Sequence, residues 1–121
     1  MGMTTSTRQI GAVTVVDIKG RIVLGEESAS VRDVVFGLLA KGQKQILLNL
    51  GAVNYIDSMG LGSLVGALVT ARKQGGELKL LNVSDKVTDV MQITKLYTVF
   101  DISNDEAAGV ASFDQSSSAT A

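Results

Sequence analysis

The sequence predicts an α/β fold with a mixed sheet of four to five strands and helices mainly on one face of that sheet. Segments rich in β-branched residues alternate along the chain with segments whose apolar residues recur at helical spacing. Helices that cross over between strands imply parallel or mixed pairing. The length of 121 residues, 45% of them hydrophobic, suits one domain with a single core.

The first half of the chain predicts two strands and a helix. Residues 13–18 are β-branched and partly alternating, which indicates a strand ending near Gly20, and Ile10 before Gly11 suggests a short preceding strand and a hairpin. From Ser28 the period changes to that of a surface helix, which Gly42 is expected to end. The apolar stripe of this helix consists of Val31, Val34, Val35, Leu38 and Leu39.

The second half predicts strands at 46–50, 77–81 and 100–102, with helices between them. Residues 46–50 are almost continuously apolar, as expected of a central strand that is covered on both faces. A second helix is expected from about Ser58 to Gln74, and Ser84 can cap a third one. Their inward-facing residues are Leu61, Leu64, Val65 and Leu68 in the second helix, and Val87, Val90 and Met91 in the third.

We expect three regions in the chain. Residues 1–8 are predicted to be a flexible N-terminus, residues 9–102 the folded domain, and residues 103–121 a Ser/Ala-rich tail that is wholly or partly disordered. The tail has too few apolar residues to offset the entropy lost on ordering.

The composition argues against several classes of function. The 11 basic residues are scattered and balanced by 12 acidic ones, which does not suit direct binding of nucleic acid. The chain has no His and no Cys, so it lacks a Ser-His-Asp triad and the common zinc ligands, and we expect no catalytic residue, metal or cofactor. The first residues carry no apolar signal, and no apolar run reaches the length of a membrane span, so a cytoplasmic protein without membrane association is expected.

Two enzymatic alternatives have weak support. Gly60-Leu61-Gly62 does not continue as a dinucleotide-binding fingerprint, because Val65 stands where the third glycine is needed. The carboxylates of Asp17, Asp57 and Asp101 could serve acid–base chemistry, but their spacing brings no pair together.

The most informative segment, residues 54–62, joins the most apolar strand to the start of the second helix. Sites in α/β proteins often lie at such positions. Ser58 can act as the N-cap of the helix, which would be a purely structural role. Gly60 and Gly62, however, lower helix propensity and leave the backbone open to an approaching macromolecule. The outward face of this helix is expected to carry small, weakly polar residues together with a methionine, which suits close packing by a partner.

This segment, Tyr55-Ile56-Asp57-Ser58-Met59-Gly60-Leu61-Gly62, resembles the Asp-Ser-x-Gly-Leu-Gly signature of the STAS domain in bacterial anti-sigma-factor antagonists. The similarity extends over roughly residues 9–102, with residues 20–22, 46–50 and 79–81 at matching spacing. It implies a STAS-type sandwich and a binding module that is not an enzyme. Ser58 would be phosphorylated by an anti-sigma factor with serine kinase activity, and only the unphosphorylated form would bind that partner. A phosphatase acting on Ser58 would reset the switch.

The motif and the helix face together predict a surface that binds the partner. Its residues are Asp57, Ser58, Met59, Gly60, Gly62, Ser63, Gly66, Ala67 and Thr70. Two positions depart from the family pattern: Met59 stands where a small residue is common, and whether Glu26 substitutes for a common Asp stays open. The alternative is a STAS scaffold subunit of a stressosome-like assembly, or a soluble component of a lipid transporter, with Ser58 mainly a helix cap.

Overall fold

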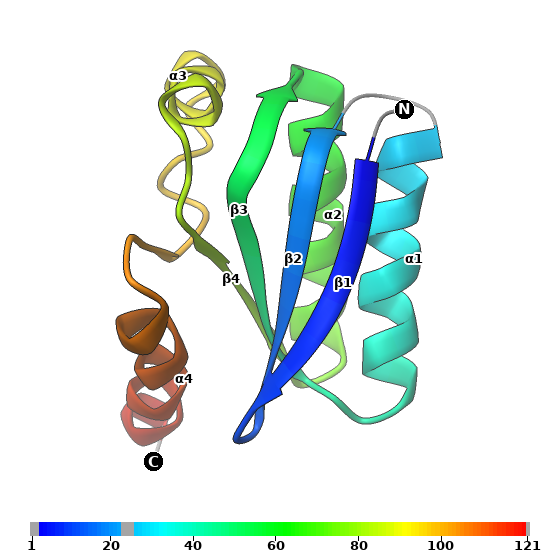
Figure 1. Cartoon of the computed structure of the whole chain (residues 1–121). Coiled ribbons are helices and arrows are strands. Elements are labelled where there is room, and N and C mark those ends of the chain that lie inside the picture. The colour runs from blue at the N-terminus through cyan, green and yellow to red at the C-terminus, as the bar shows by residue number, and fades with distance from the viewer. Residues whose placement is uncertain (1–2, 23–25, 121) are drawn as a thin grey trace.

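The computed structural model describes the backbone of residues 3–22 and 26–120, and the side chains of residues 3–22 and 31–113. In chain order its elements are β1 (Met3–Ile10), β2 (Val13–Ile22), α1 (Glu26–Ala40), β3 (Gln45–Ile56), α2 (Ser58–Lys73), β4 (Glu77–Leu81), α3 (Asp85–Thr94), β5 (Ile102–Ser103) and α4 (Glu106–Thr120) (Figure 1).

The five strands form one mixed sheet in the order β1-β2-β3-β4-β5. The hairpin pair β1–β2 is antiparallel, and the other three pairs, which are joined by crossover helices, are parallel. The predicted α/β class and mixed sheet are therefore confirmed.

Alternation along the strands divides the core between the two faces of the sheet. On one face, α1, α2 and α3 cover a large cluster that includes Val16, Ile18, Leu48 and Leu80. On the other face, α4 alone covers a small cluster formed by Val13, Val15, Leu47, Leu81 and Phe113. Figure 1 shows α4 across the sheet from α1 and α2.

The three predicted helices are present, and most of their predicted apolar stripes are buried. Val31, Val35, Leu38 and Leu39 of α1 are buried, and Val34 packs partly buried against the same cluster. In α2 and α3, Leu61, Leu64, Leu68, Val87 and Met91 are buried, whereas Val65 and Val90 are partly buried. Ser84 caps α3 as predicted, its side chain accepting a hydrogen bond from the backbone N–H of Val87.

The ordered elements extend beyond residues 9–102 at both ends. β1 begins at Met3 because a run rich in Thr, which favours strands, pairs with β2 along its whole length. At the other end, the expected tail contains α4, and Phe113 is only 1% exposed. The low apolar content of that tail gave no indication that one aromatic side chain, Phe113, is buried against the sheet. β3 is also longer than predicted and runs to Ile56, next to the start of α2.

Candidate functional site at the start of α2

The candidate site lies where β3 ends and α2 begins, at the top of the sheet in Figure 1. Asp57 is the single residue between the two elements, in an extended conformation. Its backbone N–H donates to the carbonyl of Ile22 at 3.3 Å, and its own carbonyl accepts from the N–H of Leu61 at 2.9 Å. These bonds fix the first turn of α2 against the end of β2.

Asp57, and not Ser58, is the N-cap of α2. The Oδ1 atom of Asp57 accepts a hydrogen bond of 2.6 Å from the backbone N–H of Gly60, three residues later. Ser58 is the first residue of the helix and is exposed. Its hydroxyl has no hydrogen-bond partner among the residues that the structure describes. The interpretation of Ser58 as a structural cap is therefore wrong, and its hydroxyl faces solvent at a helix N-terminus.

Gly60 and Gly62 have different surroundings. A Cβ atom on Gly60 would lie 2.2 Å from the carbonyl oxygen of Ile22, so glycine is required for α2 to approach β2. Gly60 is buried and does not form part of an open surface, contrary to the expectation from sequence. Gly62 is exposed, and a Cβ atom there would meet nothing within 4 Å. Of these two glycines, Gly62 but not Gly60 leaves the backbone of the helix open to an approaching partner, as expected from the sequence.

The solvent-facing side of α2 is a stripe of exposed and partly exposed residues, which we call the α2 face. It consists of Met59, Gly62, Ser63, Gly66, Val69 and Thr70. Met59 is 57% exposed and Val69 is 46% exposed, so this face is more apolar than an ordinary helix surface. Ala67, which we expected on this face, is fully buried because it falls on the core stripe between Leu64 and Leu68.

Tyr55 and Val69 were missing from the residues predicted to bind a partner. Tyr55 is the last residue but one of β3 and is 46% exposed, three residues before Ser58. Its neighbour across the sheet is the exposed Arg21. The register of β2 and β3, which brings Arg21 to this edge, is not visible in the sequence. The side chain of Glu26, the position that departs from the family pattern, lies outside the described residues.

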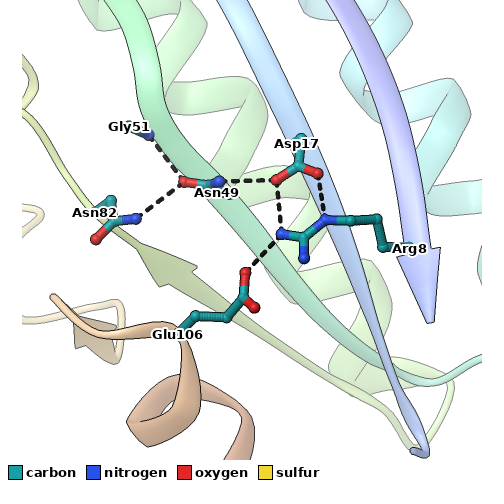
Figure 2. A network of polar contacts seen from close by, with 6 residues as sticks. All are labelled: Arg8, Asp17, Asn49, Gly51, Asn82 and Glu106. Atoms are coloured by element: carbon teal, nitrogen blue, oxygen red, sulfur yellow. Dashed lines mark hydrogen bonds and ion pairs between the residues drawn. The ribbon is translucent and has the colours of Figure 1, made fainter. Parts of the chain in front are cut away.

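The carboxylates considered for catalysis lie apart and have separate structural partners. Asp57 caps α2, and Asp101 lies 3.7 Å from the buried ammonium of Lys79. Asp17 belongs to a polar network on the α4 side of the sheet, where it binds Arg8 and Asn49 (Figure 2). The hydrogen bond from Arg8 holds the pKa of Asp17 below its ordinary value, against a smaller opposing effect of burial.

Among residues 3–22 and 26–120, no three His, Cys, Asp or Glu side chains gather as ligands for a metal ion. Within the same part of the chain, no helix combines the length and apolar character needed to cross a membrane.

Comparisons of this chain with known proteins point to one family. The family model described as the STAS domain matches residues 4–109. The anti-sigma-B factor antagonist of Bacillus subtilis is 40% identical over 72 residues, which cover 60% of this chain and 66% of that protein. The anti-sigma-B factor antagonist of Staphylococcus aureus is 36% identical over 66 residues, 54% of this chain and 61% of the relative. The aligned segments thus span slightly less than two thirds of these relatives.

Solved structures show the same fold at lower identity. An anti-sigma factor antagonist from Mycobacterium paratuberculosis superposes with a TM-score of 0.77 at 18% identity, covering 92% of this chain and 93% of that one. The antagonist SpoIIAA in its unphosphorylated form gives a TM-score of 0.75 at 18% identity, covering 93% and 97%. The Bacillus protein SpoIIAA in its phosphorylated form gives 0.69 at 18% identity, covering 91% and 99%.

Proposed function

The chain belongs to the STAS domain family, and from that premise we propose that it is an anti-sigma-factor antagonist that is switched by phosphorylation of Ser58. In its unphosphorylated form it binds an anti-sigma factor with serine kinase activity. Phosphorylation of Ser58 by that partner releases it, and a phosphatase restores the binding form. The chain is the substrate in this reaction and not the catalyst, and it acts in the cytoplasm.

The observation that carries the proposal is the exposed hydroxyl of Ser58, which has no hydrogen-bond partner among the described residues, on an otherwise ordered turn. Asp57 caps the helix, so Ser58 can be modified without removal of a structural hydrogen bond. Tyr55 and Met59, both about half exposed, flank it with apolar surface that a partner can cover. A kinase active site needs an accessible hydroxyl of this kind, with ATP, Mg²⁺ and the base supplied by the kinase.

A phosphate on Ser58 would act at the interface more than on the fold. At the helix N-terminus the negative charge is stabilised by about 0.3–1 kcal/mol. A phosphoserine beside Asp57, however, adds about −1.5 to −2 charges to a surface that the partner must cover. Covering this charge without a matching cation removes its hydration, and a hundredfold loss of affinity needs only about 2.7 kcal/mol.

The related proteins support this choice of role. Two relatives that are 40% and 36% identical over their aligned segments are named anti-sigma-B factor antagonists. A protein of the same fold, SpoIIAA of Bacillus, has been solved in a phosphorylated form. The alternative of a scaffold or transporter subunit would leave Ser58 mainly a helix cap, and in this structure the cap is Asp57.

Titration calorimetry with a purified anti-sigma factor from the same organism tests the proposal. The wild type and Ser58→Ala should bind alike, and Ser58→Asp should bind about 10- to 100-fold more weakly, a loss of about 1.4–2.7 kcal/mol. Gln74→Asp, at the exposed C-terminal end of α2, is the matched control for an added charge and should bind like the wild type. Equal binding by Ser58→Asp and the wild type would overturn the switch at Ser58.

Phosphate transfer is tested separately, by incubation with the anti-sigma factor, ATP and Mg²⁺ followed by mapping of the modified residue by mass spectrometry. We expect phosphate on Ser58 in the wild type and none in Ser58→Ala. Phosphate on another residue would refute the assignment of the site. Co-purification with membrane transporter subunits in place of an anti-sigma factor would support the transporter alternative.

A further inference from the structure

β1 forms one edge of the sheet, and its outer side carries unpaired backbone groups. It pairs with β2 in an unbroken antiparallel register over all eight of its residues. In an antiparallel ladder, alternate residues direct their N–H and C=O groups away from the partner strand, so about half of the residues of β1 present both groups outward. β2 is the one described element with which β1 makes extensive contacts, and Figure 1 shows no strand along its outer side.

This edge lacks the features that usually prevent strands from pairing. Edge strands are commonly protected by Lys or Pro, by a bulge, or by being very short. Between Met3 and Ile10 there is no Lys or Pro, and the register with β2 has no shift. The opposite edge, β5, is only two residues long. The two edges of this sheet are therefore protected to very different degrees.

The one charged side chain of β1, Arg8, does not protect the edge from strand pairing either. Arg8 is turned onto the α4 face of the sheet, where its guanidinium binds Asp17 at 2.6 Å and Glu106 at 2.6 Å (Figure 2). Its charge is thus engaged by two carboxylates within the same molecule. The rest of the strand is uncharged, and Thr4, Ser6, Thr7 and Gln9 are exposed.

We propose that β1 is a self-association surface whose occupant is β1 of a second copy of this chain, paired antiparallel about a two-fold axis. The pairing joins the two five-stranded sheets into one continuous sheet. A strand rich in Thr and Ser, whose one charge is engaged by carboxylates of the same molecule, is complementary to itself, because Thr–Thr and Thr–Ser pairs across strands are favourable and no like charges face one another. This inference goes beyond the proposed function and does not depend on it.

The symmetry restricts the register to two arrangements. A two-fold axis normal to the sheet keeps the same face of both copies on the same side, so directly opposite residues must come from the same face. The axis must then pass beside Ser6 or beside Thr7 if most of the strand is to pair. In the first register Arg8 faces Thr4 of the second copy, and in the second it faces Ser6. In neither arrangement does Arg8 face Arg8 of the second copy.

Pairing through β1 has two consequences for the assembly. The interface is the same patch on both copies and β5 is short, so the assembly closes as a dimer and does not continue as a fibre. Because the paired strands run in opposite directions, the two copies of Ser58 point to opposite ends of the dimer and stay open to a partner. A strand pair of this length buries less area than a standard stable interface, so we expect a weak dimer whose population rises with protein concentration.

Single cysteines test the contact and its register, since the chain has no Cys of its own. Directly opposite residues of an antiparallel pair have Cα atoms about 4.5–5.5 Å apart, within the range of a disulfide. We expect Ser6→Cys or Thr7→Cys, whichever lies at the axis, to form about tenfold more disulfide-linked dimer on mild oxidation than Gln92→Cys, a control on the exposed side of α3. If neither variant exceeds Gln92→Cys, the proposal is overturned.

Sedimentation equilibrium of the unmodified chain gives an independent result. The weight-average mass should rise from 12.6 kDa toward about twice that value as concentration increases. The double variant Ser6→Lys/Thr7→Lys places like charges at either axis and should remain monomeric. Gln74→Lys/Gln92→Lys adds the same charge at exposed positions away from β1 and should still associate. A wild type that stays at the monomer mass up to about 1 mM would also overturn the proposal.

Discussion

Two glycines of α2 look equivalent in the sequence, yet only one of them is required by packing. Gly60 lies where a Cβ atom would be 2.2 Å from the carbonyl oxygen and 2.8 Å from the carbonyl carbon of Ile22. Backbone atoms cannot rotate away as a flexible side chain can, so α2 would have to move away from β2. Gly62 faces solvent, and its only cost is the low helix propensity of glycine.

Gly60→Ala and Gly62→Ala should therefore change stability in opposite directions. We expect Gly60→Ala to lower the free energy of unfolding by about 2–4 kcal/mol, because overpacking here displaces backbone. Gly62→Ala should raise it by about 0.5–1 kcal/mol, since Ala is the better helix former. Urea unfolding followed by circular dichroism measures both values. Similar effects of the two substitutions would contradict the close approach of α2 to β2.

At the scale of secondary structure, the Asp17 network connects elements that are distant in sequence. Arg8 of β1 reaches Asp17 of β2 and Glu106 at the start of α4, and Asn49 of β3 donates to Asp17 at 2.7 Å (Figure 2). The hydrogen bond from Arg8 lowers the pKa of Asp17 relative to its ordinary value of 3.8. The ionised carboxylate thus favours the arrangement of three strands and one helix.

This shift makes stability depend on pH in a defined direction. A carboxylate whose pKa is lower in the folded state contributes stability that is present above its unfolded pKa of 3.8 and is lost as pH falls through the folded value. The difference in unfolding free energy between the wild type and Asp17→Asn should be largest near pH 7 and should shrink below about pH 4. Urea unfolding from pH 2.5 to 7 measures it. A difference that does not change with pH would mean that Asp17 is not held by Arg8.

Asp89→Asn is the matched control for loss of one carboxylate. Asp89 is exposed on α3 and has no hydrogen-bond or ion-pair partner among the described residues. Its substitution should change stability at pH 7 by less than about 0.5 kcal/mol.

Elements that are specified by a local sequence pattern were predicted, whereas an element that depends on tertiary contacts was not. The stripe of α1 and the apolar run of β3 are local patterns, and the structure confirms both elements. α4 was not predicted because the contacts that hold it against the sheet are tertiary: Phe113 in the small core cluster, the Lys79 ammonium 4.8 Å from its ring, and the ion pair of Glu106 with Arg8. The pairing of residues 79 and 113 is a tertiary contact and has no counterpart in the composition of the tail.

The same distinction explains the candidate site. The strand, the turn and the helix start were predictable from residues 54–62, because apolar runs and helix-start residues act locally. The identity of the N-cap could not be predicted, since both Asp57 and Ser58 can cap a helix. The structure makes Asp57 the cap, and the backbone hydrogen bond from Asp57 to Ile22 holds it in that position. The burial of Gly60 likewise depends on β2, which lies more than thirty residues away in the sequence.

At the scale of the whole molecule, Ser58 lies outside the interactions that hold the fold together. Ser58 is exposed, and the bonds that hold its turn come from Asp57, Gly60 and Ile22. A negative charge at position 58 meets the helix N-terminus, where it changes stability by about 1 kcal/mol or less. The core clusters on the two faces of the sheet do not include this residue. Phosphorylation should therefore alter a surface and leave the fold unchanged.

The amide NMR spectrum of Ser58→Asp should show this separation directly. We expect shifts confined to the turn at residues 56–62 and to Ile22, with the resonances of β1 and α4 unchanged. The midpoint of thermal unfolding should stay within about 4–8 °C of the wild type, as a change of 1 kcal/mol implies for a domain of this size. Gln74→Asp, at the other end of α2, supplies the pattern produced by a charge that lies outside the site. Shifts that spread to β1 and α4 would show a conformational change through the sheet, and any loss of partner binding by Ser58→Asp would then need a different explanation from charge at the interface.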